Sequence, residues 1–365
     1  MAELVEHDSE ADLTEQMSAA REARTSLDIR GGGTKGFYGN PARAAQVLDV
    51  SVHQGVVAYE PTELAITVRA GTPLATVEAL LAQHDQELPF EPPHFGPAAT
   101  VGGMVAAGLS GPRRPYAASV RDAVLGVRLL NGEGKAMDFG GRVMKNVAGY
   151  DLSRLMAGSL GILGVLLNVS LKVAPVPAGR MTLVQEQTLD GALVLLKRWA
   201  RRALPFTGTA WLDGKLYVRL GGSEEGLKQT HQIVGGLPMP DADAFWTDLR
   251  EQRLAFFDGD APLWRLSVRP ATPATDLRID GAGEPLVEWG GALRWLRGEL
   301  PAEQRRDRAK TAGGHATLFR PGRVEPPADG VFTPLEPVVA RLHHNLKQAF
   351  DPAGILNPGR LYPDL

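Results

Sequence analysis

Three consecutive glycines follow a short apolar run near the N-terminus and constrain this fold more than any other feature. The segment RGGGTKG covers residues 30–36 and comes directly after TSLDI. Glycine loses more chain entropy on folding than other residues and adds no side chain to a core, so such a run is typical of backbone that another group must approach closely. Consecutive N–H groups after a strand can converge on an anion such as a pyrophosphate. Taken alone, the segment is equally consistent with a tight bend at a sheet edge.

Two more glycine-rich stretches favour a ligand over a simple bend. They are ATVGGMVAAGLSG (99–111) and SLGILGV (159–165). The first turn does not open the long helix of a Rossmann unit, and it lacks the G-K-[ST] ending of a P-loop. Several separated places of close backbone approach indicate a long, extended ligand, and a dinucleotide is the natural example.

Composition excludes several classes of function. The chain has 365 residues, a net charge of -3 and no cysteine. Disulfides, thiolate metal sites, a cysteine nucleophile and an iron–sulfur cluster held by this chain are therefore excluded, and nothing indicates a nucleic-acid surface. The acidic N-terminus lacks the apolar region of a secretory signal, and no run reaches the roughly 20 apolar residues of a membrane span. We expect a cytoplasmic protein.

Hydrophobic patterning predicts an α+β fold in two parts. Short strands alternate with helices up to APVPAG (174–179), where the composition changes and a linker is expected. Beyond it, several strand-like segments and amphipathic helices predict an antiparallel domain with helices on one face. We expect domains at 1–174 and 180–334, with a helix and tail at 335–365 returning to the first domain. Asp151 is expected to cap a helix over LSRLMAG, preceded by a packed Tyr150.

The glycine-rich stretches and their order resemble the FAD-binding domain of the vanillyl-alcohol oxidase, or PCMH-type, flavoprotein family. More narrowly, KNVAGYDLSRLMAGS (145–159), GGALRWLRG (290–298) and the ending ILNPGRLYPDL (355–365) are similar to the FAD-binding E subunits of bacterial glycolate oxidases. The resemblance runs over nearly the whole chain. It implies a two-subdomain FAD-binding domain, one subdomain with a small parallel sheet and one antiparallel, and a smaller antiparallel α+β cap domain.

The resemblance also implies which residues contact FAD. The turn would hold the pyrophosphate, the segment from 94 to 110 would line the riboflavin half, and 161–165 would touch the adenosine or ribityl portion. The C-terminal tail would return to the flavin through Asn357. The implied contacts are Arg30, Gly31, Gly32, Gly33, Thr34, Lys35, Gly36, His94, Ala99, Thr100, Gly102, Gly103, Ala107, Ser110, Gly161, Ile162, Leu163, Gly164, Val165 and Asn357.

The flavin is expected to be non-covalent, because the turn carries Thr34 and Lys35 where some relatives carry a linking histidine, and no cysteine exists. Relatives that oxidise D-2-hydroxy acids carry a spaced histidine pair and a nearby acidic residue. Here His315 stands alone, and His343 and His344 are adjacent on an expected helix, where neighbouring side chains point about 100° apart. We therefore expect no metal site and identify no catalytic residue; His315 is interpreted as a structural histidine rather than a base.

By resemblance, the chain is a subunit of a complex that oxidises glycolate to glyoxylate. A sister FAD subunit would carry out the oxidation, and an iron–sulfur subunit would pass the electrons on. Any attachment to the inner membrane would be made through these partners. The present chain would relay electrons or support the assembly. Two alternatives stay open: an independent flavin-dependent 2-hydroxy-acid oxidoreductase, and a non-catalytic scaffold with the flavoprotein fold.

Overall fold

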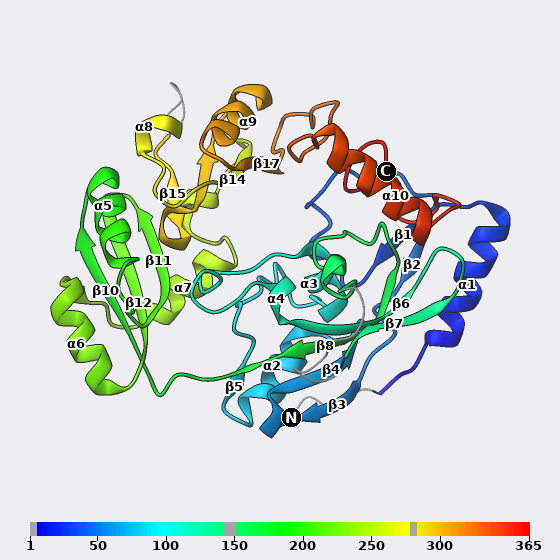
Figure 1. Cartoon of the computed structure of the whole chain (residues 1–365), viewed down its shortest axis with the longest axis horizontal. Coiled ribbons are helices and arrows are strands. Elements are labelled where there is room, and N and C mark those ends of the chain that lie inside the picture. The colour runs from blue at the N-terminus through cyan, green and yellow to red at the C-terminus, as the bar shows by residue number, and fades with distance from the viewer. Residues whose placement is uncertain (1–5, 142–150, 278–282) are drawn as a thin grey trace.

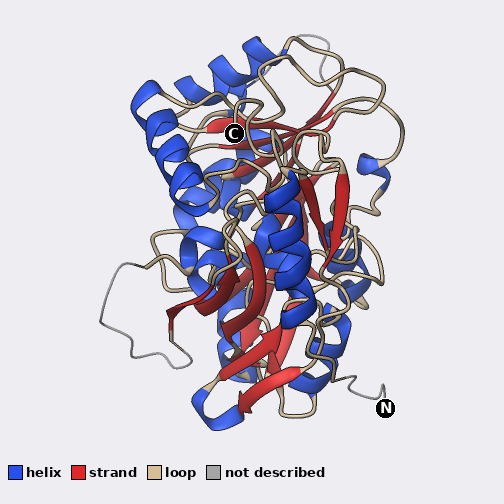
Figure 2. Cartoon of the chain, turned by 90° about the vertical axis from the view of Figure 1, so that its right-hand side faces the viewer, coloured by secondary structure: helices blue, strands red, loops and turns tan. Residues whose placement is uncertain are grey.

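Two groups of strands organise the chain. The computed structural model describes residues 6–141, 151–277 and 283–365. The first half holds a five-stranded sheet and a separate pair of parallel strands, and the second half holds an eight-stranded sheet. The halves lie beside each other in Figure 1, and Figure 2 shows the molecule from the side that carries α1. We call the eight-stranded sheet the cap sheet.

The N-terminal helix and the parallel strands bring the glycine turn into place. Helix α1 (Glu10–Ala23) buries Leu13, Met17 and Ala20, which recur at helical spacing on one face. It ends at Arg24 in the left-handed conformation, where the backbone N–H bonds the oxygen of Ala20. Strand β1 (Leu27–Arg30) then pairs in parallel with β2 (Gln46–Asp49), and the glycine turn follows β1 directly.

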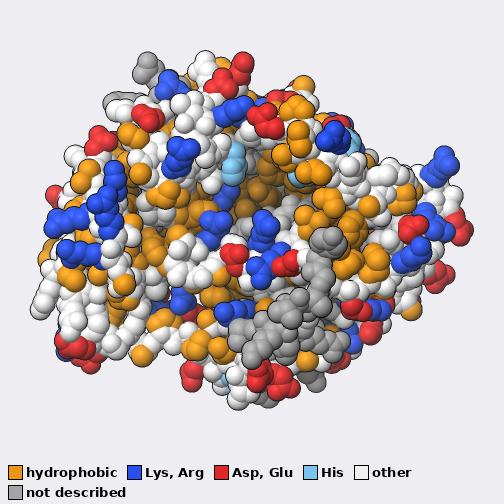
Figure 3. Space-filling view, in the orientation of Figure 1, with side chains coloured by type: hydrophobic (Ala, Val, Ile, Leu, Met, Phe, Trp, Pro, Cys, Tyr) orange, Lys and Arg blue, Asp and Glu red, His pale blue; other side chains and the backbone are white. Residues whose placement is uncertain are grey.

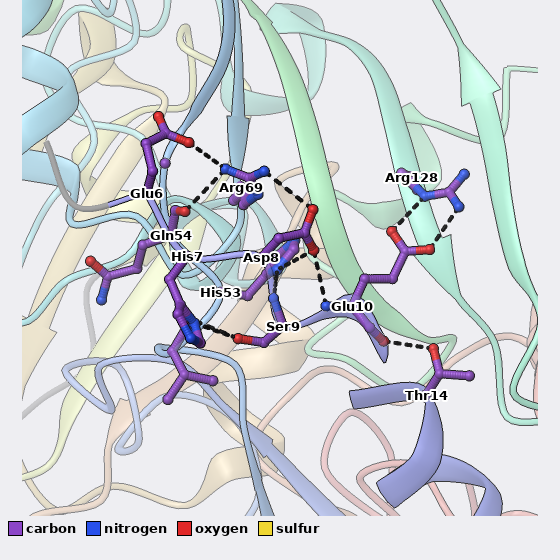
Figure 4. A network of polar contacts seen from close by, with 12 residues as sticks. Glu6, His7, Asp8, Ser9, Glu10, Thr14, His53, Gln54, Arg69 and Arg128 are labelled. Atoms are coloured by element: carbon purple, nitrogen blue, oxygen red, sulfur yellow. Dashed lines mark hydrogen bonds and ion pairs between the residues drawn. The ribbon is translucent and has the colours of Figure 1, made fainter. Parts of the chain in front are cut away.

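A polar network ties the segment before α1 to the five-stranded sheet (Figure 4). Arg69 donates to Glu6 at 2.6 Å and to Asp8 at 3.2 Å. The buried imidazole of His53 accepts a 3.0 Å hydrogen bond from the backbone N–H of Ser9 through Nδ1. Because Nδ1 is the acceptor, this bond requires His53 to be neutral there.

The five-stranded sheet is antiparallel throughout, in the order β3-β4-β8-β6-β7. A hairpin turn at NGEG (131–134) joins β6 to β7, and the side-chain oxygen of Asn131 accepts from the N–H groups of Glu133 and Lys135. The strands are β3 (Val56–Glu60), β4 (Ala65–Arg69), β6 (Val124–Leu130), β7 (Ala136–Gly140) and β8 (Val165–Lys172). Around them lie α2 (Leu74–Ala82), α3 (Val101–Ala107), α4 (Val120–Ala123) and the short pair β5 (Gln86–Glu87) and β9 (Ala174–Pro175).

The cap sheet is antiparallel and has the order β13-β10-β12-β11-β15-β16-β14-β17. Its strands are β10 (Gly179–Glu186), β11 (Phe206–Leu212), β12 (Lys215–Gly222), β13 (Leu237–Pro238), β14 (Leu263–Ser267), β15 (Leu286–Glu288), β16 (Leu293–Arg297) and β17 (His315–Arg320). The helices of this half are α5 (Leu189–Trp199), α6 (Glu224–Val234), α7 (Ala242–Arg250), α8 (Ala274–Leu277) and α9 (Ala302–Thr311). Short 3-10 turns occur at Pro61–Glu63, Arg154–Met156, Ala255–Phe257 and Trp289–Gly291.

The C-terminal helix packs on the first half, beside β1 and β2 in Figure 1. Helix α10 (Pro337–Phe350) inserts the buried Lys347, whose ammonium donates to the carbonyl oxygens of Ile162 and Leu356 and to the carboxylate of Asp351. All three bonds are between 2.6 and 2.9 Å. They join the third glycine-rich stretch to the tail, so the end of the chain packs on the first half.

Most of the predicted elements are confirmed, with one exception near residue 151. LSRLMAG does not form an α-helix: the structure has a 3-10 turn at Arg154–Met156, and the Asp151 carboxylate accepts from the Ser153 hydroxyl at 2.9 Å. Tyr150 lies outside the described residues. Across the described parts of the chain, no helix is both long and apolar enough to span a bilayer.

Candidate functional site

The three glycine-rich stretches meet around one cavity of about 400 Å³. This volume is within the usual range for small-molecule and cofactor sites. Each stretch contributes backbone to the wall, and β1 and the C-terminal tail complete it. The lining residues expected from the sequence are Arg30, Gly31, Gly32, Gly33, Thr34, Lys35, Gly36, Thr100, Gly102, Gly103, Ala107, Gly161, Gly164 and Asn357.

The glycines of the first turn are required by the protein's own packing as well as by any ligand. A Cβ built on Gly32 would lie 1.5 Å from the carbonyl oxygen of Ala98, and one on Gly31 would lie 2.3 Å from the Thr100 hydroxyl. Gly33 has φ +69, a left-handed conformation that side chains disfavour. The turn therefore packs directly against the second glycine-rich stretch, and this contact explains why Gly31 and Gly32 carry no side chain.

The second stretch begins helix α3 and packs on the five-stranded sheet. The Thr100 hydroxyl caps the helix by accepting from the N–H of Gly103 at 3.2 Å. A Cβ at Gly102 would lie 2.8 Å from the Cβ of Ala70, so Gly102 lets the helix approach β4 closely. A Cβ at Gly103 would meet only the Thr100 hydroxyl, at 3.1 Å, and Gly103 lines the cavity. A side chain at Gly103 would thus project into the cavity.

The C-terminal tail closes the cavity through two residues. Asn357 donates to the oxygen of Leu160 at 2.6 Å and accepts from the N–H of Ile29 at 2.7 Å. Arg360 donates to the carbonyl oxygens of Gly36 and Tyr38, both at 2.7 Å. The sequence predicted Asn357 as a contact residue but not Arg360. The signal for Arg360 was available, because it is a cation in a tail that was already expected to reach the flavin.

Lys35 provides a second cation at the cavity wall. Its ammonium donates to the backbone oxygen of His94 at 3.1 Å and lies 5.9 Å from the centre of the Phe95 ring. Burial lowers the pKa of Lys35 to about 8, while the attraction of Glu251 opposes this shift. Lys35 therefore links the first turn to the loop before α3 and is still largely protonated at neutral pH.

Six expected contact residues lie outside the cavity lining. The His94 side chain pairs instead with Glu78 at 3.0 Å. Ser110 lines a separate, smaller cavity, and its hydroxyl accepts from the N–H of Val120. The remaining four have side chains buried in the hydrophobic interior: Ala99 just before α3, Ile162 and Leu163 in the turn before β8, and Val165 at the start of β8.

The histidines do not form a pair. His315 on β17 is exposed, and within the described residues its side chain makes no hydrogen bond, so it is not the satisfied structural histidine that the sequence suggested. His343 and His344 bond the carbonyl oxygens of Val339 and Ala340 on their own helix. Among the described residues, no group of three His, Asp or Glu side chains is arranged to hold a metal ion.

The residues of the main cavity fit a dinucleotide with a pyrophosphate. The wall offers bare backbone from three stretches, two cations from Lys35 and Arg360, and small side chains on α3. Asp28, the carboxylate at the wall, is paired with Arg30. The donor set is thus suited to an elongated anion, as the sequence had indicated.

Comparisons with known proteins agree with this geometry. A family model described as an FAD binding domain matches residues 2–140, and one described as the C-terminal domain of FAD linked oxidases matches residues 333–361. The chain is 48% identical over 353 residues to the glycolate oxidase subunit GlcE of Escherichia coli (strain K12), covering 97% of both chains. It is 29% identical over 175 residues to the glycolate oxidase subunit GlcD of Bacillus subtilis (strain 168), covering 47% of this chain and 37% of GlcD.

Solved structures show the same fold. The chain matches p-cresol methylhydroxylase with substrate bound at a TM-score of 0.74 and 14% identity, covering 99% of this chain and 88% of that one. It matches alkyldihydroxyacetonephosphate synthase at a TM-score of 0.68 and 14% identity, covering 96% and 76% of the two chains. At this identity the similarity establishes the fold alone, and it confirms the fold class predicted from the sequence.

Proposed function

This chain belongs to the family of the glycolate oxidase subunit GlcE, within the FAD-binding PCMH-type flavoproteins, and from that premise we propose that it holds FAD as a non-substrate-oxidising subunit of a glycolate oxidase. The observation that carries the proposal is the cavity of about 400 Å³ in which all three glycine-rich stretches and the C-terminal tail meet. FAD, when bound, supplies two-electron chemistry and can pass electrons on singly. We propose a flavin domain over 1–174, a cap domain over 180–334 and a returning tail over 335–365.

Within this proposal, each group of residues has a stated task. The backbone of Gly31 to Gly36 binds the pyrophosphate, and Lys35 and Arg360 offset its charge. Thr100, Gly102, Gly103 and Ala107 hold the riboflavin half against α3. Gly161, Gly164 and Asn357 complete the wall on the side of the tail. His94, Ala99, Ser110, Ile162, Leu163 and Val165 act at most through the residues they support, since they do not line the cavity.

The proposed flavin is not covalently attached. The first turn carries Thr34 and Lys35, the chain has no cysteine, and among the residues described at the cavity wall there is no histidine. Acid precipitation of the purified protein should therefore release all of the yellow colour into the supernatant. Colour that stays with the pellet would contradict non-covalent binding without contradicting flavin binding itself.

We assign glycolate oxidation to a sister FAD subunit and onward electron transfer to an iron–sulfur subunit. Removing a hydride from glycolate needs a base close to the hydroxyl, and neither His343 nor His344 lines the main cavity in which we propose that the flavin binds. One-electron transfer through an iron–sulfur cluster needs cysteines that this chain lacks. Any association with the inner membrane would then be made by the partners.

The test is to express the chain alone and with its proposed partner subunits. We expect the isolated chain to be yellow and not to reduce a dye with glycolate, whereas the assembled complex reduces it. A colourless chain would favour the scaffold alternative. Anaerobic bleaching of the isolated chain by glycolate, at the rate of the complex, would favour the independent oxidoreductase.

A further inference from the structure

One carboxylate of the second half bonds the backbone of the first half. Glu251 lies directly after helix α7, and its side chain is only 8% exposed. Both of its oxygens accept from the backbone N–H of His94 at 3.1 Å, and one also accepts from that of Phe95 at 2.8 Å. In Figure 1, α7 lies where the two halves meet. Glu251 therefore ties the second half to the loop before α3 (residues 93–99).

The backbone of this loop has a conformation that needs support. Phe95 has φ 54, a left-handed conformation that bulky residues rarely adopt. The consecutive N–H groups of His94 and Phe95 converge on one carboxylate, as they do in the backbone nests that bind anions. Hydrogen bonds to a charged acceptor are stronger than neutral ones. The Glu251 carboxylate thus stabilises a loop conformation that is unfavourable for Phe95 itself.

The same loop packs against the first glycine turn in two places. The backbone oxygen of His94 accepts from the ammonium of Lys35 at 3.1 Å. The carbonyl oxygen of Ala98 lies so close to Gly32 that a Cβ on Gly32 would come within 1.5 Å of it. The position of Lys35 and the shape of the turn therefore depend on the loop, and the loop is held by Glu251.

The two halves do not fill the whole space between them, so single polar contacts matter for how they dock. In the orientation of Figure 1, Figure 3 shows a hollow near the middle of this face of the molecule, with hydrophobic side chains deep inside and cationic side chains at its margin. Arg219 of β12 pairs with Glu91 across the junction at 2.7 Å. Within the parts of the chain that the structure describes, Glu251 is the side chain of the second half that bonds His94.

Glu251 also affects the charge of Lys35. Burial lowers the pKa of Lys35 to about 8, and the attraction of Glu251 opposes this shift. Arg320 on β17 is a like charge on the same side, since its guanidinium lies 5.6 Å from the centre of the Phe95 ring that Lys35 also faces. The other charged groups at the cavity wall are Asp28, Arg30 and Arg360. Without Glu251, Lys35 loses its proton at a lower pH.

We propose that Glu251 is a positioning residue for the flavin, whose carboxylate fixes the loop before α3 so that Lys35 is presented to the pyrophosphate. The inference rests on the function proposed above, since it takes FAD as the ligand of the main cavity. Glu251 does not line that cavity and acts only through His94 and Phe95. FAD binding thereby depends on how the second half docks on the first.

The experiment measures the affinity of the full, flavin-free chain for FAD between about pH 6 and pH 10 from the change in flavin fluorescence. Protonated Lys35 attracts the pyrophosphate, so the wild-type affinity should be full at low pH and fall as pH rises through about 8. In Glu251→Gln we expect a Kd raised about tenfold, the size of a lost charge-assisted hydrogen bond, and a fall displaced to lower pH. Lys35→Met should have a raised Kd and no such fall.

Asp248→Asn is the matched control. It makes the same change from carboxylate to amide on α7, at a residue that pairs with Arg253 near the surface, and it should keep the affinity and the pH profile of the wild type. A Kd and a pH profile in Glu251→Gln equal to those of the wild type would overturn the positioning role while leaving FAD binding intact. A wild type that binds no FAD would overturn the proposed function, and the positioning role with it.

Glu251→Asp serves if Glu251→Gln does not fold, because it keeps the negative charge and draws the carboxylate back by one methylene. We expect a Kd raised several-fold, together with faster amide hydrogen exchange at residues 94–95 in the flavin-free chain. An unchanged Kd would overturn the positioning role, even if exchange becomes faster, because the loop contact would then have no effect on the flavin.

Discussion

The carboxamide of Asn357 lies directly against Gly161, so that a Cβ at Gly161 would come within 2.6 Å of Asn357 Nδ2. This contact joins the third glycine-rich stretch to a tail almost 200 residues later in the chain. Asn357 has φ 41, a left-handed conformation that Asn tolerates better than most residues, and Gly161 has φ +75. Both residues line the main cavity, so the contact sets the shape of its wall.

We expect Asn357→Ala to lower both stability and flavin occupancy. The substitution leaves the N–H of Ile29 and the oxygen of Leu160 without their partner, and two lost buried hydrogen bonds cost about 2 kcal/mol or more. Urea unfolding and the ratio of flavin to protein absorbance measure the two effects. Asn345→Ala on the exposed face of α10 is the control and should change neither. Full flavin occupancy in Asn357→Ala would show that the C-terminal tail does not contribute to flavin binding.

Gly103 and Gly226 allow a matched test of the main cavity. Both follow a capping hydroxyl by three residues, and a Cβ at either would meet only that hydroxyl, at 3.1 Å from Thr100 and 3.2 Å from Ser223. Only Gly103 lines the cavity. We therefore expect Gly103→Leu to reduce flavin occupancy sharply while the protein stays folded, and Gly226→Leu to keep full occupancy. Circular dichroism checks the fold, and equal occupancy in the two variants would contradict the proposed site.

The local parts of this site were predictable from the sequence, and the long-range parts were not. The glycine turn after β1 depends on neighbours a few residues away and was visible in the pattern, whereas helix α3 and its Thr100 cap were not predicted. The sequence explained the bare backbone of Gly32 by a ligand or by a tight bend, whereas the structure shows Gly32 packed against the carbonyl oxygen of Ala98. Nothing local could show that contact.

Burial and distant charges explain the remaining differences. Ile162, Leu163 and Val165 sit in a segment that approaches the cavity, yet their side chains point into the core, and only Gly161 and Gly164 reach the wall. The position of Arg360 in the returning tail was visible in the sequence, but its partners Gly36 and Tyr38 lie more than 300 residues earlier and are brought to it only by folding.

The raised pKa of Glu288 predicts that the free energy of unfolding falls as pH rises. Its pKa is about 7 in the folded chain and 4.5 as an ordinary glutamate, because burial disfavours the charged form. Between these values the unfolded chain has released a proton that the folded chain retains, so stability is full below pH 4.5 and decreases through pH 7, by about 3 kcal/mol. Urea unfolding at pH 5 and pH 8 measures this. Glu288→Gln should remove the difference in unfolding free energy between the two pH values. Glu225→Gln, which changes an exposed carboxyl on α6, should retain it. A wild type that is equally stable at both pH values would contradict a buried neutral carboxyl at Glu288.

His315→Ala separates substrate oxidation by this chain from oxidation by a partner. His315 is the first residue of β17 and is the histidine weighed above as a base. Partial desolvation, together with the nearby Arg265, lowers the pKa of its imidazole. If a sister subunit oxidises glycolate, the assembled complex carrying His315→Ala should keep its glycolate-dependent dye reduction within a few fold, because no proton of the substrate passes through this residue. The same variant should retain its flavin, since His315 does not line the main cavity. A loss of about a hundredfold or more in dye reduction, with flavin content and assembly intact, is the size expected for removing a general base and would move the chemistry into this chain.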